Sequence, residues 1–101
     1  MSTPSFVHLH VHTQFSVLDG VNHIGPLLEK VKGLGMNSVA LTDHGNLFGA
    51  IAFYQEAQRQ GVRPIIGCEL YLSPTHYQDR TSAEAKSQHH LTLLTKDYTG
   101  Y

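Results

Sequence analysis

The sequence has almost no cysteine, and it contains no long hydrophobic run. Cys68 is the only cysteine among the 101 residues, which excludes an internal disulfide and a cysteine-based zinc finger. No apolar run approaches the ~20 residues that are needed to span a bilayer. The N-terminal residues MSTPSFVH lack the basic and apolar regions of a signal peptide. These absences predict a cytoplasmic protein with no membrane partner.

Charged residues are also scarce, at 15% of the chain with a formal net charge of −1. The lysines and arginines are scattered and form no run. A protein that binds duplex phosphates through its side chains needs a clustered positive surface. This segment alone is therefore not expected to provide the main binding surface for a nucleic acid. At the same time, a hydrophobic content of 41% with so few charges excludes a disordered chain.

Histidine, in contrast, is abundant, with eight residues in 101. These residues are dispersed along the chain, so an affinity tag does not explain them. Histidine is the commonest metal ligand in proteins and titrates near neutral pH. The positions of the histidines are therefore the main guide to function.

Strand and helix patterns alternate along the chain. The sequence predicts strands over 6–13, 37–42, 62–73 and 90–95, and helices over 24–34 and 47–60. In the second helix, Leu47, Ile51, Tyr54 and Ala57 fall on one side, and Asn46 can cap its start. The polar excursion 74–88 is expected to contain a helical turn around SAEAKSQ. This order predicts an α/β fold with a parallel sheet and right-handed crossovers.

The chain is short for such a sheet. Parallel strands are covered on both faces, which two helices cannot do for four strands, and a closed (β/α) barrel needs ~250 residues. We therefore expect residues 1–101 to be the front portion of a larger domain. A small complete α/β domain is the alternative.

The stretch HLHVH places three histidines on the first predicted strand. Because successive side chains of a strand point to opposite faces, His8, His10 and His12 share one face. His10 and His12 lie at the carboxyl end of the strand, where parallel α/β folds place their chemistry. His8 lies deeper and is expected to make hydrogen bonds inside the sheet. A solvated face with three polar residues is the alternative explanation.

The second predicted strand ends in ALTDHGN, which puts Asp43 and His44 at the same end of the sheet. A capping aspartate and an exposed loop histidine are the alternative there. Asp19 lies in the loop after the first strand, beside Gly20, and by itself is typical of an ordinary turn.

Glu69 interrupts the apolar strand IIGCELYL, and a buried carboxylate is paired, metal-bound or neutralised. Cys68 points to the opposite face and is expected to be a small core residue. In the last strand, His89 and His90 point to opposite faces, so only one of them can join a cluster; spacing does not choose between them. Histidine with carboxylate and without thiolate suits zinc, manganese or iron(II).

Four segments of this sequence resemble a known family. The segments HLHVHTQFSVLDG, ALTDHGNLFGAIAFY, RPIIGCELYL and HHLTLLTKDYTGY are similar, in this order, to the polymerase-and-histidinol-phosphatase (PHP) domain. HxHT with TDHG is characteristic of PHP proteins in general. NLFGA and the closing HLTLLTKDYTGY resemble the branch at the N-terminus of the alpha subunit of bacterial replicative DNA polymerase III.

The resemblance implies a distorted (β/α) barrel of which this chain is the first part, with the rest of the barrel and the polymerase domains beyond residue 101. It implies metal ligands at His10, His12, Asp19, His44, Glu69 and, of the adjacent pair, His90. Asp43 would orient a neighbouring ligand from outside the metal's own shell. Divalent ions, zinc first and manganese or iron(II) as alternatives, would lower the pKa of water toward ~7. No side chain is assigned as a separate catalytic base.

The function implied by the resemblance is metal-dependent phosphodiester hydrolysis, with 3′–5′ proofreading of a DNA primer end as part of a DNA polymerase. The partners implied are the primer end, a proofreading subunit and a sliding clamp. Two alternatives stay open. One is a stand-alone phosphatase of the histidinol-phosphate kind, and the other is a non-catalytic PHP domain that stabilises or docks other subunits.

Overall fold

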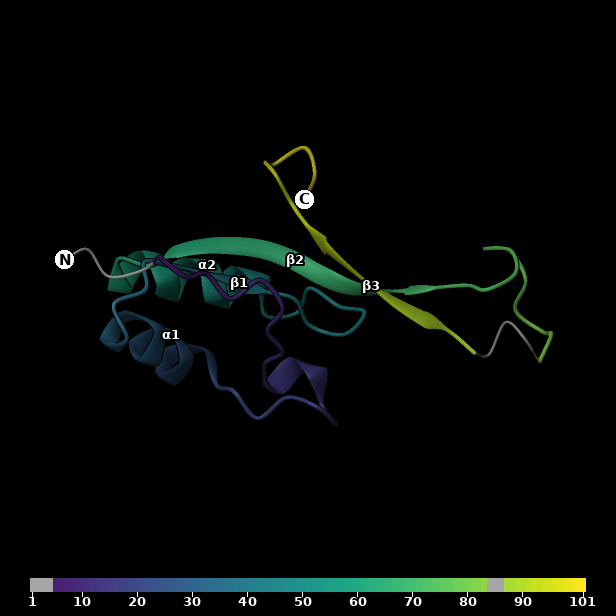
Figure 1. The fold of residues 1–101 in the computed structure, drawn as a ribbon, viewed down its shortest axis with the longest axis horizontal. Helices are drawn as coiled ribbons and strands as arrows, with labels where there is room; N and C mark the ends of the chain where they lie inside the picture. The colour runs from purple at the N-terminus through teal and green to yellow at the C-terminus, as the bar shows by residue number, and fades with distance from the viewer. Residues whose placement is uncertain (1–4, 84–86) are drawn as a thin grey trace.

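Two α-helices and a three-stranded mixed sheet make up most of the regular structure of the described residues (Figure 1). The computed structural model describes residues 5–83 and 87–101. The elements are a short 3-10 helix η1 (Gln14–Ser16), α1 (Ile24–Gly33), β1 (Ser38–Leu41), α2 (Ala50–Gln60), β2 (Arg63–Leu72) and β3 (His89–Leu94). The predicted α/β class is therefore confirmed, as are both helices and the last three strands.

β1 and β2 form the parallel part of the sheet, connected through α2. Their register places Ser38 opposite Arg63 and Leu41 opposite Ile66. All four residues of β1 are buried, which explains why this strand is a continuous apolar run rather than an alternating one. The parallel pairing brings the carboxyl ends of both strands to the same edge of the sheet.

β3 runs antiparallel to β2, so the prediction of an all-parallel sheet is wrong for this strand. Leu72 lies opposite His89 and Gly67 lies opposite Leu94. A parallel crossover needs a connection that returns along the sheet, usually a helix. The described residues of the connection 73–88 form turns and bends and no helix, and the chain reverses at their far end. The helical turn predicted around SAEAKSQ lies partly on residues 84–86, outside the described residues.

The predicted first strand is also not a strand in the structure. Residues 6–13 run extended beside β1 and pair with it only at an isolated bridge between His8 and Val39. The backbone N–H of Val11 donates to the side chain of Thr42 at 2.8 Å, instead of to a backbone carbonyl. The hydroxyl of Thr42 thus interrupts the ladder that would make this segment a regular strand.

The helix α2 begins three residues later than predicted, because residues 48 and 49 form a turn before it, and the backbone N–H of Ala50 donates to the carbonyl of Leu47 at 3.1 Å. The side chain of Asn46 accepts from the backbone N–H of Phe48 at 3.1 Å, so it caps the turn and not the helix. Gly61 ends the helix in the left-handed conformation, as expected for a glycine C-cap. Phe53 and Ala57 are buried, while Ile51 is 61% exposed and Tyr54 is 47% exposed, so Ala57 is the one residue of the side chosen from the sequence that lies in the core.

The core lies between the two helices and the parallel strands. Phe53 is its largest fully buried side chain, and the extended segment 6–13 adds Val11 at its edge. The buried cluster consists of Leu28, Val31, Val39, Leu41, Phe53, Ala57 and Val62. In contrast, β3 and the distal half of β2 project away from this core, with several half-exposed apolar side chains (Figure 1). None of the helices in the described ranges has the length and apolar character needed to cross a bilayer.

Candidate metal centre

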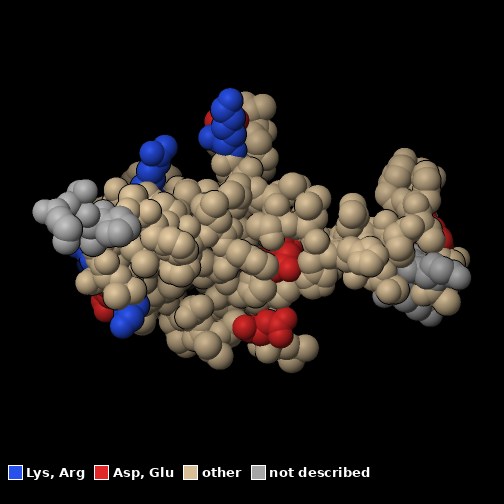
Figure 2. Space-filling model, viewed as in Figure 1, with Lys and Arg blue, Asp and Glu red and all other residues tan. Residues whose placement is uncertain are grey.

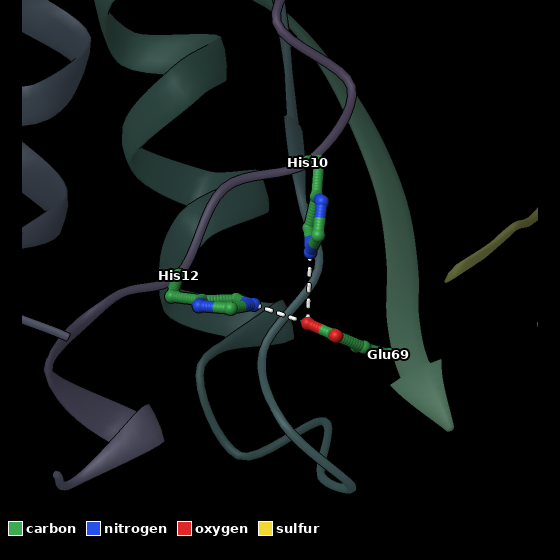
Figure 3. A group of neighbouring side chains, drawn as sticks. All are labelled: His10, His12 and Glu69. Atoms are coloured by element: carbon green, nitrogen blue, oxygen red, sulfur yellow. Dashed lines mark hydrogen bonds and ion pairs between the residues drawn. The ribbon is translucent and has the colours of Figure 1, made fainter. Parts of the chain in front are cut away.

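Glu69 is the point on which the candidate ligands converge. Its carboxylate is 6% exposed and lies near the carboxyl end of β2. The Nε2 atom of His10 lies 2.8 Å from Oε2 of Glu69, and the Nε2 atom of His12 hydrogen-bonds to the same oxygen. Figure 3 shows the two rings approaching this oxygen from the extended N-terminal segment. The structure thus brings together residues that are 59 and 57 positions apart in the chain.

His44 connects this group to Asp19. Its Nε2 atom lies 3.0 Å from Oδ2 of Asp19, and its Nδ1 atom lies 3.5 Å from Oε2 of Glu69. The Nδ1 atom is buried and has no hydrogen-bond partner among the described residues. Asp19 is 64% exposed, so its carboxylate lies on the solvent side of the cluster.

His90, and not His89, is the member of the adjacent pair that reaches the cluster. Its Nδ1 atom lies 2.7 Å from Oε1 of Glu69. The antiparallel direction of β3 explains how a residue near the start of a strand joins ligands at the carboxyl ends of others. Because Tyr71 lies opposite His90, the start of β3 meets the end of β2.

The donor atoms fall into two overlapping groups that share Glu69. His10, His12 and Glu69 form one, and His44, Glu69 and His90 form the other, with the ligand atoms of each group within 4.8 Å of one another. Several imidazole nitrogens face one carboxylate, and one buried nitrogen is left without a partner. This nitrogen–oxygen donor set fits a divalent ion, for which imidazole and carboxylate are ordinary ligands.

The histidines change the acidity of Glu69. Burial alone would raise the pKa of its carboxyl group, but hydrogen bonds from His10, His90 and His12 and the charge of His44 outweigh that effect. The pKa of Glu69 is lowered from 4.5 to about 2. The carboxylate is therefore ionised at neutral pH, the state in which it can bind a cation.

Asp43 supports the centre through the backbone. Its buried carboxylate accepts from the backbone N–H of Thr13 at 2.6 Å and from the hydroxyl of Ser16 at 2.7 Å. The same Ser16 hydroxyl accepts from the backbone N–H of His44 at 3.0 Å. In the described residues the contacts of Asp43 do not include a histidine ring, in contrast to the orienting contact that we expected. Asp43 instead fixes the chain directly after His12 and, through Ser16, the backbone of His44.

Sequence reasoning missed Thr13 and Ser16, which are both buried polar residues. A hydroxyl residue directly after HxH is the signal that could have identified Thr13, since a buried carboxylate at Asp43 needs nearby donors. His8 also differs from expectation. Its side chain is exposed and contacts the ring of Phe6 at a centroid distance of 4.8 Å, while its backbone carbonyl accepts from Ala40.

Cys68 lies beside the centre without joining it. Its sulfur donates weakly to the backbone carbonyls of Asp43 at 3.5 Å and Asn46 at 3.6 Å. Burial raises the pKa of the Cys68 thiol. The thiol therefore stays neutral at neutral pH. Cys68 is only half-buried and lies outside the buried core cluster, so the predicted core position is not confirmed.

In the part of the chain that the structure describes, the ion pairs of Glu69 and Asp19 are all with histidines and include no lysine or arginine. On the face drawn in Figure 2, lysine and arginine atoms appear at separate places, and acidic atoms lie nearer the middle of the molecule. Attraction for an anionic substrate must therefore come from a source other than a lysine or arginine cluster on this face.

Comparison with known proteins identifies the relatives of this arrangement. The model of the PHP domain family matches residues 8–101. DNA polymerase III subunit alpha of Helicobacter pylori (strain ATCC 700392 / 26695) is 50% identical over 98 residues, which are 96% of this chain and 8% of that protein. The same subunit of Thermus aquaticus is 49% identical over 100 residues, which are 95% of this chain and 8% of that protein. The chain thus spans less than a tenth of the length of these relatives.

A solved structure shows a similar arrangement of the chain. The crystal structure of a candidate metal-dependent phosphoesterase from Bifidobacterium adolescentis matches with a TM-score of 0.61 and 28% sequence identity. The match covers 70% of this chain and 24% of that chain.

Proposed function

The chain belongs to the PHP domain family, and from this premise we propose that it is the N-terminal part of the PHP domain of a bacterial replicative DNA polymerase III alpha subunit. We propose further that it contributes a divalent-metal centre for phosphodiester hydrolysis. The observation that carries this proposal is the convergence of imidazole nitrogens from three distant segments, which contain His10 and His12, His44, and His90, on the single carboxylate of Glu69. The high identity to polymerase subunits over nearly the whole chain favours this branch over a stand-alone phosphatase.

The proposed domain is a distorted (β/α) barrel of which residues 1–101 form the front portion. Half-exposed apolar side chains on the face of the β2–β3 pair opposite Glu69 support this view, because a complete domain covers such surfaces. Leu70 is 39% exposed and Leu91 is 44% exposed. The match covers only 24% of the chain of the solved phosphoesterase, so most of that protein lies outside the part that resembles residues 1–101.

The proposed ligands are the residues that the structure brings together around Glu69, with zinc as the first candidate ion and manganese or iron(II) as alternatives. They are His10, His12, Asp19, His44, Glu69 and His90. When bound, such ions activate water and offset charge on the phosphoryl oxygens.

The residues of the chain prepare this site in three ways. The ionised carboxylate of Glu69 holds the imidazole rings in place. Asp43 fixes the backbone that follows the ligands His10 and His12 through its hydrogen bonds with Thr13 and Ser16. The exposed carboxylate of Asp19 fixes the ring of His44 while leaving the solvent side open to a phosphodiester.

In the proposed setting, the substrate is the 3′ end of a DNA primer, and hydrolysis is 3′–5′ exonucleolytic proofreading. The proposed partners are the primer–template held by the rest of the polymerase, a proofreading subunit and a sliding clamp, all in the cytoplasm. When bound, the ions would compensate for the scarcity of lysine and arginine in the chain, whose side chains lie at separate places on the face drawn in Figure 2.

The adjacent histidines of β3 offer a matched test in the full-length protein. His90→Ala removes a proposed ligand, whereas His89→Ala removes a neighbouring exposed imidazole that the cluster does not use. We expect His90→Ala to lower metal affinity at least about tenfold and to reduce excision of a mismatched 3′ nucleotide. His89→Ala should retain both properties, and both variants should retain DNA synthesis.

Metal content by mass spectrometry and excision of a radiolabelled mismatched primer provide the measurements. Equal metal content and excision in both variants would contradict the proposed centre. Metal binding without excision by the unmodified protein would instead identify a structural or docking domain. Hydrolysis of a small phosphomonoester in preference to the primer would identify a phosphatase of the histidinol-phosphate kind.

A further inference from the structure

Tyr71 lies at the edge of the proposed centre and is not one of its ligands. It follows Glu69 by two residues on β2, so both side chains lie on the same face of the strand. It is also opposite His90 in the antiparallel pair. The rings of Tyr71 and His90 lie 5.2 Å apart at an angle of 90°. A single imidazole therefore separates the tyrosine ring from the carboxylate that gathers the ligands.

The turn after β1 leaves space for this ring. Gly45 adopts a φ of 61°, and a Cβ atom added there would lie 2.6 Å from Cε2 of Tyr71. Only glycine lets the turn contact the ring so closely. The backbone N–H of Gly45 also donates to the carbonyl of Glu69 at 2.9 Å, which fixes the turn against β2. The tyrosine ring is thus held in place by a backbone surface and by a ligand ring.

Despite these contacts, Tyr71 remains 49% exposed. An aromatic ring that is held rigidly and is half open to solvent provides a stacking surface at little entropic cost. Bases of single-stranded nucleic acids stack on such rings regardless of sequence. The scarcity of basic side chains makes a non-ionic contact with the substrate more valuable at this site.

We propose that Tyr71 is a substrate-binding residue whose ring stacks on the base of the 3′-terminal nucleotide while the centre holds the adjoining phosphodiester. This inference rests on the proposed function and adds to it the element of the substrate that is recognised. The competing explanation is that Tyr71 only packs against His90 and Gly45 and so keeps a ligand in position. The two explanations differ in whether the effect of removing the Tyr71 ring on primer binding depends on the presence of the terminal base.

The test uses Tyr71→Leu, which keeps an apolar side chain on the strand but removes the ring, and Tyr71→Phe, which keeps the ring. Tyr54→Leu on α2 is the matched control, since Tyr54 is 47% exposed and lies outside the cluster. Each full-length variant is assayed with a primer that ends in a normal nucleotide and with one that ends in an abasic nucleotide. Binding is measured separately with 2-aminopurine at a 3′ end protected by a phosphorothioate, because stacking quenches its fluorescence.

We expect Tyr71→Leu to raise the KM for the normal primer about tenfold, within the range that one stacked base contributes, with little change in kcat or metal content. The same variant should leave the KM for the abasic primer unchanged and should weaken the quenching. Tyr71→Phe keeps the ring, so it should keep the fluorescence quenching and the difference in KM between the two primers. Tyr54→Leu should behave as the unmodified protein.

Equal effects of Tyr71→Leu on both primers, a loss of bound metal in that variant, or unchanged quenching would overturn the inference. A failure of the proposed function gives a different result. In that case the unmodified protein cleaves neither primer, and the quenching difference between the unmodified protein and Tyr71→Leu still decides the role of Tyr71.

Discussion

Replacing Glu69 by glutamine should dismantle the proposed centre with the least change in shape. Glu69 accepts from His10, His12 and His90, and its Oε2 atom faces the buried Nδ1 atom of His44. A glutamine keeps one oxygen but turns a nitrogen with two hydrogens toward rings that need an acceptor. Both overlapping ligand groups lose their shared carboxylate. We expect metal affinity to fall at least about 100-fold, which corresponds to about 2.7 kcal/mol.

The same substitution should change the acid dependence of stability in the metal-free protein. The pKa of Glu69 is about 2 in the folded state against an ordinary 4.5, so its contribution is present above about pH 4.5 and is lost as the pH falls through about 2. The difference in urea midpoint between the unmodified protein and Glu69→Gln should therefore be large near neutral pH and vanish at about pH 2.

Glu56→Gln on α2 is the control for the metal affinity. Its carboxyl group also has a pKa of about 2, caused first by its hydrogen bond with Arg59, but it has no contact with the cluster. Isothermal titration with zinc should show unchanged affinity in Glu56→Gln and a large loss in Glu69→Gln. Retention of full affinity by Glu69→Gln would refute the view that this carboxylate joins the ligands.

Two further predictions concern the support of the site and the core. Asp43→Asn places an amide where Thr13 and Ser16 donate, which should cost about 1–3 kcal/mol and speed hydrogen exchange over residues 8–16; exchange equal to that of the unmodified protein would count against this support. Phe53→Ala should destabilise the domain by about 3–5 kcal/mol in urea unfolding, whereas Phe48→Ala, at a side chain 79% exposed, should change stability by less than about 0.5 kcal/mol. Equal costs at the two positions would contradict the assigned core.

The sequence predicts β1, α2 and β2 well, because the sequence patterns that indicate these elements are local. The apolar run of β1 and the glycine that ends α2 each fix one element without reference to distant residues. The direction of β3, in contrast, is not fixed by a local signal. It depends on where the connection 73–88 leads the chain, and a polar segment of that length carries no periodicity that indicates a direction.

The candidate ligands could be named from the sequence, but their contacts could not. The choice of His90 over His89 came from resemblance, and the antiparallel pairing with Tyr71 now gives it a physical reason. The contact between His44 and Asp19 depends on a loop path that includes η1. The same holds for the Asp43 network, whose donors lie 27 and 30 residues earlier in the chain.

Anomalous X-ray diffraction from crystals of the full-length protein grown with zinc tests the central claim most directly. The account predicts an anomalous peak about 2.0–2.2 Å from an imidazole nitrogen of His12 and a carboxylate oxygen of Glu69. A zinc-saturated crystal in which these rings still contact the carboxylate directly, with no peak between them, would contradict it.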